Sequence, residues 1–311
     1  MTRKREIIEI TGGSYRALIN VSEGANCICL ENVKYGADLL RQPDYSAGID
    51  NPFLYGMPIL FPVNRIHAGR FRFEGREYTF PINEPKTGCH LHGELHAKPF
   101  TVDERTKSSV ICSYDSGTER LGFPHQFHVT LAYSLSDAGL SLKTEIANHS
   151  GLNMPVLLGF HTTFNVPFLK NGAAENVRVT ADVGDEVVRS TDRYLPTGEI
   201  LPYTHTSALL NAGAFKPHGN PISLHYQAAG EGRIILTDVE SGISVVYDND
   251  AKFGWRLFYN GNADQFICLE PQTCMVNCLE SGLDDSYTGF DFIAPFSKKV
   301  FDSSIFLKKI S

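Results

Sequence analysis

The sequence lacks long hydrophobic runs and blocks of positive charge. Its longest apolar stretches, such as residues 155–160, are far shorter than the roughly 20 residues of a membrane-spanning helix. Lys and Arg total 28 against 35 Asp and Glu, and the only basic cluster is Arg3-Lys4-Arg5. A nucleic-acid-binding protein needs a basic stripe to contact phosphates. We therefore expect neither a membrane nor nucleic acid as a partner.

The sequence also lacks a cysteine pattern typical of disulfides or metal sites. It has seven cysteines, an odd number, and no CxxC pair. Cys274 and Cys278 have no nearby histidines that would complete a zinc site. Residues 2–10 are polar with only short apolar pieces, unlike a secretory signal. These features predict reduced, mostly buried thiols and a cytoplasmic location.

Helical patterning is missing as well. No window of a dozen residues keeps apolar side chains at three- and four-residue spacing without an interrupting Gly or Pro. Instead, apolar residues alternate on both sides of turns, which predicts hairpins at 125–146, 71–80 and 233–247, and another strand at 253–259. Short strands without intervening helices favour an antiparallel sandwich or barrel. Because no linker divides the chain, we expect one all-β domain over residues 1–311.

Two distant segments each place one titratable side chain among apolar or small neighbours. His161 lies in 159–165, and Glu270 lies in 268–273. A histidine beside an apolar run is often a satisfied core residue, and a glutamate between Leu269 and Pro271 can belong to a structural ion pair. If the two side chains share a cleft, they can instead take a proton from one oxygen and give one to another. That chemistry suffices to open and close a sugar hemiacetal.

Two further polar residues follow an apolar run that ends in proline. Asn64 and Arg65 come directly after 58–63, and the rigid prolines there predict that both side chains have defined orientations. The guanidinium of Arg65 offers a fork of donors that suits sugar hydroxyls or a ring oxygen. A surface arginine paired with a carboxylate is the competing interpretation. We treat both residues as candidates for substrate binding.

A histidine pair lies in the segment 88–93. His90 and His92 are two residues apart, so on an extended strand they point to the same side. This spacing is also found in metal sites, but no companion such as HExxH supplies a third ligand. One histidine that binds a ligand in a polar cleft is the preferred interpretation, with Gly93 leaving room beside it.

In order and wording, these segments resemble the aldose 1-epimerase (galactose mutarotase) family over about residues 50–295. The matching pieces are Pro58 to Ile66, Gly69 to Gly75, Asn83-Glu84, Leu91-His92-Gly93, His161 with Phe164-Asn165, Leu195 to Glu199, and Leu269 to Gln272. The resemblance implies a large antiparallel β-sandwich, called a supersandwich, and a single-domain isomerase that needs no cofactor and no metal. We expect a monomer or a homodimer.

The resemblance also implies residue roles. The glutamate matching Glu270 is the general base at the anomeric hydroxyl, and the histidine matching His161 is the general acid toward the ring oxygen. His92 matches a histidine that binds and polarises the sugar, and Arg65 matches an arginine that contacts it. His90 has no counterpart. An aromatic wall for the sugar is expected as well, with Phe164 or Trp255 as candidates.

One departure concerns substrate choice. Family members commonly carry Ile-Asp-His, where the aspartate binds a sugar hydroxyl, but this sequence has Ser223 at the matching place in 221–225. Serine supplies no charge and reaches less far, so galactose itself is not specified. The main prediction is a mutarotase of a free hexose. A mutarotase of a phosphorylated or modified hexose, a non-catalytic sugar-binding protein, and a glycoside hydrolase using Glu199 are the alternatives.

Overall fold

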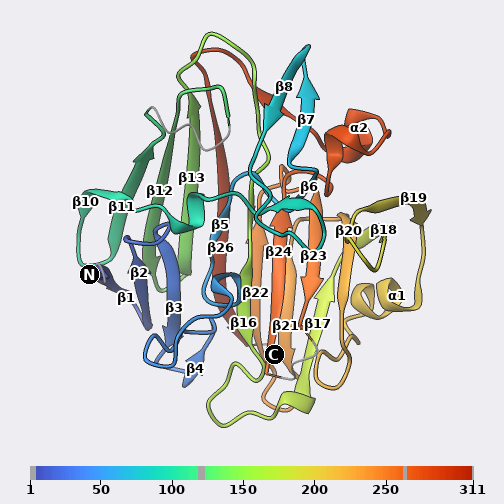
Figure 1. Ribbon diagram of the computed structural model, residues 1–311. Coiled ribbons are helices and arrows are strands. Elements are labelled where there is room, and N and C mark those ends of the chain that lie inside the picture. Colours follow the sequence, from blue (N-terminus) through green and yellow to red (C-terminus); the bar gives the residue numbers. More distant parts are fainter. Residues whose placement is uncertain (1–4, 118–122, 262–264, 310–311) are drawn as a thin grey trace.

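The computed structural model describes residues 5–117, 123–261 and 265–309, so Arg3 and Lys4 of the basic cluster lie outside it. Within these ranges the chain is built mainly of antiparallel strands in two large sheets (Figure 1). Sheet I has the order β10-β11-β12-β13-β26-β22-β21-β17, and sheet II has the order β19-β18-β20-β23-β24-β15-β5, with β16 also paired to β24. The prediction of an all-β antiparallel sandwich is confirmed.

The strand bounds of sheet I are β10 Thr101–Arg105, β11 Ser109–Asp115, β12 Phe127–Ser136, β13 Gly139–Asn148, β17 Val177–Ala181, β21 Ile234–Asp238, β22 Ile243–Asn249 and β26 Lys298–Lys309. Those of sheet II are β5 Ile59–Leu60, β15 Gly159–Phe160, β16 Thr162–Asn165, β18 Val183–Arg189, β19 Pro196–Leu201, β20 Ser223–Ala228, β23 Trp255–Tyr259 and β24 Phe266–Gln272.

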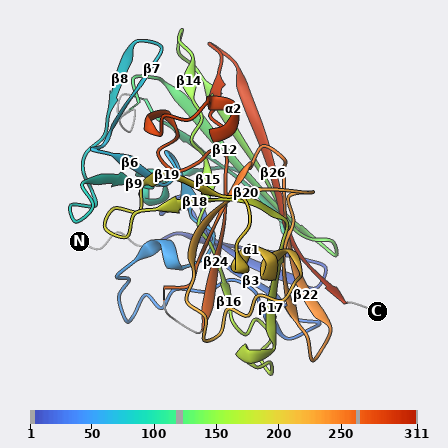
Figure 2. The same cartoon turned by 90° about the vertical axis from the view of Figure 1, so that its right-hand side faces the viewer.

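Smaller sheets and two short helices complete the fold. An N-terminal sheet contains β1 Ile7–Gly12, β2 Tyr15–Asn20, β3 Asn26–Asn32 and β4 Ala37–Asp38. Three strand pairs follow: β6 Arg65–His67 with β9 Cys89–Leu91, β7 Arg70–Phe73 with β8 Arg76–Thr79, and β14 Met154–Pro155 with β25 Phe292–Ile293. The β7–β8 hairpin projects from the upper end of the molecule in both views (Figures 1 and 2). The helices are α1 His205–Asn211 and α2 Asp285–Thr288.

The predicted hairpins all form. β12 pairs with β13 across the turn that joins Ser136 to Gly139, and buried and more exposed side chains alternate along β12. β7 pairs with β8, and β21 pairs with β22. The two-residue period of the sequence therefore places one side of each of these strands toward the interior.

Helix α1 was not predicted because it has only seven residues, fewer than the window in which helical spacing was sought. The side chains of Thr204 and Ser207 cap its first turn reciprocally, each accepting from the other's backbone N–H. No helix of the described residues is long and apolar enough to cross a membrane. All seven cysteines are buried and unpaired.

The inner faces of the two large sheets meet in the core. The Phe164 ring of β16 lies 5.6 Å from the Tyr247 ring of β22, and the hydroxyls of Thr162 and Tyr247 are 3.0 Å apart. Strand β24 is buried along its whole length, which makes it a central strand of the sandwich. A carboxylate on such a strand is isolated from bulk water, and Glu270 is on β24.

Candidate active site

A cavity of about 520 Å³ lies at sheet II and contains all five residues singled out in the sequence. Glu270 comes from β24, and His161 lies between β15 and β16. Asn64 and Arg65 come from the start of β6, and His92 directly follows β9. Segments more than 200 residues apart in the chain therefore form one wall of one cavity.

Strand pairing brings Glu270 and His161 together. Gly159 of β15 lies opposite Gln272, and Thr162 of β16 lies opposite Leu269, so the residue between β15 and β16 faces the middle of β24. Nε2 of His161 is 3.1 Å from Oε1 of Glu270. Both side chains are almost fully buried, with exposures of 6% and 1%. At this distance a proton can pass directly between them.

Burial shifts the two pKa values in opposite directions. Removal from water raises the pKa of Glu270 to about 8, although the nearby Arg189 charge opposes this shift. Removal from water lowers the pKa of His161 to about 3. At neutral pH the pair therefore holds one proton, and burial favours its placement on Glu270.

A chain of amides fixes the carboxylate of Glu270. Nε2 of Gln272 donates to Oε2 of Glu270 at 3.2 Å, and Nδ2 of Asn64 donates to Oε1 of Gln272 at 3.0 Å. The side chain of Asn64 is buried and its amide is engaged by Gln272. Asn64 therefore lies in the cavity wall and is linked to Glu270 through Gln272.

The imidazole of His92 is held in one protonation state. The backbone N–H of Asn64 donates to Nδ1 of His92 at 3.3 Å, so the neutral ring carries its proton on Nε2. Burial lowers the pKa of His92 well below 6.5, with the charge of His161 as a further cause. The ring packs against Phe53 at 4.7 Å. His92 therefore offers a hydrogen-bond donor to a ligand.

The expectation that His90 and His92 point to the same side is wrong. Strand β9 ends at Leu91, and the backbone of His92 has a φ of 60°, so the alternation of an extended strand no longer applies. His90 turns away from the cavity, where its Nδ1 is 2.7 Å from the carbonyl oxygen of Pro81. Among the residues of known position, no three His, Cys, Asp or Glu side chains are grouped as a metal site requires.

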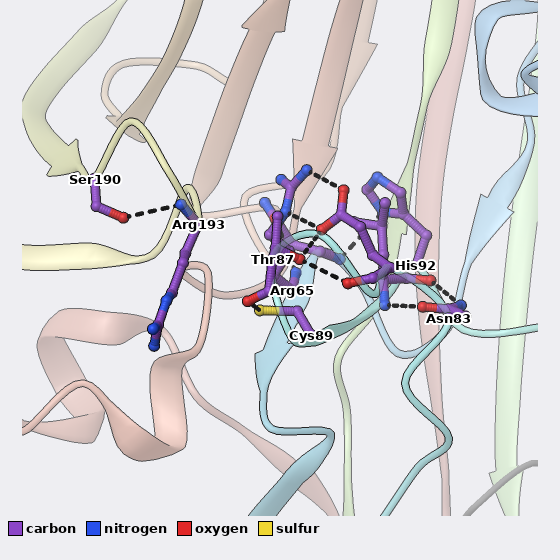
Figure 3. A network of polar contacts seen from close by, with 10 residues as sticks. Arg65, Asn83, Thr87, Cys89, His92, Ser190 and Arg193 are labelled. Atoms are coloured by element: carbon purple, nitrogen blue, oxygen red, sulfur yellow. Dashed lines mark hydrogen bonds and ion pairs between the residues drawn. The ribbon is translucent and has the colours of Figure 1, made fainter.

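Arg65 both lines the cavity and pairs with a carboxylate, so the ion pair is present and contact with a substrate stays a prediction. Its Nε and Nη2 donate to the two carboxylate oxygens of Glu84 at 2.7 and 2.8 Å. Burial alone would raise the pKa of Glu84, but hydrogen bonds from Arg65 and Thr87 outweigh burial and lower it. Glu84 is therefore an anion tied to Arg65 and not a proton donor. Figure 3 shows Arg65, Thr87 and His92 within this polar network.

Arg189 is a cavity residue that the sequence did not reveal. It ends β18, and its Nη2 donates to the backbone carbonyl and the hydroxyl of Ser223 at 2.7 and 3.0 Å. The ring of Tyr194 lies beside both cavity arginines, 4.7 Å from Arg65 and 6.0 Å from Arg189. Burial lowers the pKa of Arg189 to about 10, so it remains cationic at neutral pH. The serine at 223 was the one local signal that pointed to this part of the cavity.

The prediction that Phe164 or Trp255 forms an aromatic wall of the cavity is wrong. Phe164 is fully buried and packs on the core side of β16. Trp255 shares a face of β23 with the cavity residue Tyr259, but α2 covers it, with the Tyr287 ring 5.9 Å away. The aromatic rings that line the cavity are those of Phe53, Tyr194 and Tyr259. Sequence alternation gave the face of β23 but not which part of that face was covered.

Glu199, the candidate second carboxylate for glycoside hydrolysis, does not line the cavity. It is exposed on β19, next to Gly198 at a φ of 89°. The carboxylates that do line the cavity are Glu84 and Glu270, and the first is engaged by Arg65.

Known proteins resemble this chain in sequence and in fold. The solved structure of a galactose mutarotase-like protein from Clostridium acetobutylicum superimposes with a TM-score of 0.91 at 28% identity, covering 99% of this chain and 98% of that one. The uncharacterized protein YihR of Escherichia coli is 25% identical over 285 residues, which are 90% of this chain and 87% of YihR. Rat galactose mutarotase is 31% identical over 157 residues, 49% of this chain and 42% of the rat protein.

A match to a protein-family model assigns the chain to a family. The model of the aldose 1-epimerase family matches residues 6–286, which include every cavity residue discussed above. This chain belongs to the aldose 1-epimerase family.

Proposed function

We propose that this protein interconverts the α and β anomers of an aldose. The observation that carries the proposal is the 3.1 Å contact between His161 and Glu270 in the wall of a cavity of about 520 Å³. Mutarotation needs one group that removes a proton from the anomeric hydroxyl and one that supplies a proton to the ring oxygen. A pair that shares a single proton meets both needs.

In the proposed reaction, the Glu270 carboxylate removes the proton from the C1 hydroxyl while protonated His161 donates to the ring oxygen. The bond between C1 and the ring oxygen breaks, which leaves a free aldehyde. Rotation about the C1–C2 bond presents the other face of the aldehyde, and the reverse transfers close the ring. No proton is gained or lost over the cycle, so no cofactor is required.

Burial supports ring opening in this scheme. Opening transfers a proton to Glu270 and takes one from His161, and this is the distribution that removal from water favours. The closed sugar reacts when Glu270 is ionised and His161 is protonated. Direct transfer of the proton from Glu270 to His161 over 3.1 Å can supply this state. Each well-placed acid or base contributes on the order of 10²- to 10⁴-fold to the rate.

The other predicted residues have supporting roles in this proposal. Nε2–H of His92 donates to an oxygen of the sugar, since its Nδ1 is already engaged. Arg65, held in place by Glu84, orients the sugar and stabilises negative charge that develops on oxygen. Asn64 acts through Gln272 on the position of the Glu270 carboxylate.

Polarimetry tests the proposal. Freshly dissolved α-glucose and α-galactose should reach anomeric equilibrium faster with the protein than without it. Replacement Glu270→Gln should lower the catalysed rate by about 10²-fold or more, whereas Glu199→Gln, an exposed glutamate on β19, should not. A sugar that binds by calorimetry without faster mutarotation would instead indicate a non-catalytic sugar-binding protein. Undiminished activity of Glu270→Gln would refute the assignment of the base.

The cytoplasmic location, the single domain over residues 1–311 and a monomeric or homodimeric state belong to the same proposal. The seven buried, unpaired cysteines support a reducing compartment. Buried apolar side chains from both large sheets belong to one core cluster, which supports a single domain.

A further inference from the structure

Arg189 is a cation of the cavity that forms no ion pair with a carboxylate among the described residues, although Glu270 and Glu186 act on it at longer range. Its polar contacts there are the carbonyl and hydroxyl oxygens of Ser223, both of which are neutral. Arg65, by contrast, is neutralised by two hydrogen bonds from its guanidinium to Glu84. A guanidinium without a carboxylate in a partly buried site is costly, so a reason for its presence is needed.

The charges around the cavity add up to one excess positive charge. Arg65 and Glu84 cancel, Glu270 and His161 together hold one proton and are neutral as a pair, and His92 is uncharged. Arg189 remains. The protein as a whole carries a formal net charge of −7, so this local positive charge is opposite in sign to the molecule.

The residue at position 223 explains why the charge of Arg189 is uncompensated. The family resemblance predicts an aspartate there, and Ser223 stands in its place. Because Nη2 of Arg189 reaches the Ser223 hydroxyl at 3.0 Å, a carboxylate at this position would form an ion pair with Arg189. The serine leaves the guanidinium free to bind an anion brought by the ligand.

Arg189 forms no hydrogen bond or ion pair with His161 or Glu270, although its charge acts on the Glu270 carboxyl at longer range. Its strand β18 is separated from β24, which carries Glu270, by β20 and β23. Three strand spacings correspond to roughly 14 Å between the two backbones. Both side chains extend into the same cavity, so a single sugar can contact His161 and Glu270 at its anomeric end and Arg189 at its other end.

We propose that the aldose carries one singly charged oxyanion at the end remote from C1, as in a hexuronate or a hexose 6-sulfate, and that Arg189 binds this group. The proposal rests on the proposed function, because it names the substrate of the same site. A guanidinium presents two parallel N–H donors that match the oxygens of such an anion. A phosphate monoester carries close to two charges at neutral pH and would leave one uncompensated.

Mutarotation rates for matched sugars test the proposal. The polarimetric kcat/KM is measured for glucose, galactose, glucuronate, galacturonate, glucose 6-sulfate and glucose 6-phosphate. A carboxylate or sulfate should raise kcat/KM by about tenfold or more over the neutral hexose, as a charge-assisted hydrogen bond allows. This preference should weaken as salt is added, because ions screen the attraction. The 6-phosphate should fall below the singly charged sugars.

Two variants locate the effect. In Arg189→Gln, the ratio of kcat/KM for glucuronate to that for glucose should fall by about 10- to 100-fold. In Ser223→Asp, the introduced carboxylate should pair with Arg189 and lower the same ratio while the guanidinium stays in place. Arg193→Gln is the matched control, because Arg193 is an exposed arginine that pairs with Asp192 and points away from the polar network (Figure 3).

The outcomes distinguish failure of the proposed role of Arg189 from failure of the proposed mutarotase function. Fast turnover of neutral hexoses with no preference for the anionic sugars would overturn the role of Arg189 and leave the mutarotase assignment intact. An anionic preference that both variants retain would overturn it as well. A 6-phosphate preferred over the other anions would replace a singly charged substrate by a phosphorylated one. Acceleration of none of these sugars would refute the proposed function and, with it, this inference.

Discussion

Replacement of Glu270 by glutamine should stabilise the protein while it removes activity. Glutamine has nearly the same shape and can still accept the hydrogen bond from Gln272 that Glu270 receives at 3.2 Å. Its amide can donate to the neutral ring of His161. The substitution therefore removes the titratable group with little change in packing, and the change in stability reports on the buried carboxyl group itself.

The magnitude follows from the pKa of Glu270. Its ordinary value is 4.5, and burial raises it to about 8 in the folded protein. A raised pKa means that the stability contributed by the protonated group is complete below pH 4.5 and is lost as the pH rises toward 8. Each pH unit in this window corresponds to about 1.36 kcal/mol. Relative to glutamine, the wild-type free energy of unfolding should therefore be lower by roughly 3 kcal/mol at pH 7 and by about 1 kcal/mol at pH 5.

Urea denaturation of both proteins at several pH values between 5 and 8 measures this difference. The pH dependence of the difference is the decisive quantity, because effects of packing are the same at every pH. Titration of His161 occurs in both proteins and largely cancels. Glu199→Gln, an exposed glutamate on β19, is the control and should differ from wild type by a constant amount. A difference between Glu270→Gln and wild type that does not grow with pH would show that the carboxyl group is not held protonated by burial.

Three further predictions concern the pH dependence of activity and two substitutions. The pH profile of wild-type kcat/KM should be bell-shaped, with an alkaline limb near pH 8, where the His161–Glu270 pair loses its only proton, and an acid limb toward pH 3, where the pair takes up a second proton; polarimetry extended to the acid side as far as the protein stays folded measures both. Glu84→Gln should lower kcat/KM for glucose by about tenfold, because Arg65 loses its charged partner, and retention of full activity would contradict this role. Gly93→Ala should cost about 2 kcal/mol or more in urea denaturation, because φ is 63° and the new Cβ would lie 2.0 Å from the carbonyl oxygen of Phe61.

Much of the fold was predictable because a strand with one buried side alternates apolar and polar residues, and this alternation is visible in the sequence. The hairpin of β12 and β13 alternates buried and exposed side chains, and this period was visible without the structure. Strand β24 gave no such pattern because it is buried on both sides, as are central strands in general. Glu270 was singled out instead as an isolated carboxylate among apolar residues, and its predicted role as the base came from the family resemblance.

The candidate site was predictable only where a residue has an unusual local setting. His161 and Glu270 stand out because each is polar within a buried segment. Arg189 has no such setting, since it ends an ordinary strand and its position depends on the pairing of β18 with β20. Sequence alternation also wrongly predicted that His90 and His92 point to the same side, because the strand ends at Leu91 and His92 has a positive φ.

The placement of these groups on different strands has a consequence for how substrates can change within this fold. The proton-transfer pair is fixed by the register of β24 with β15 and β16, whereas Arg189 and Ser223 lie on β18 and β20 at the other side of the cavity. Exchanging a serine for an aspartate at position 223 alters the charge presented to the sugar without moving the strands that hold the pair. If the proposed function holds, selection of the sugar and the chemistry at C1 can therefore vary independently, since the ring-opening step is the same for every aldose.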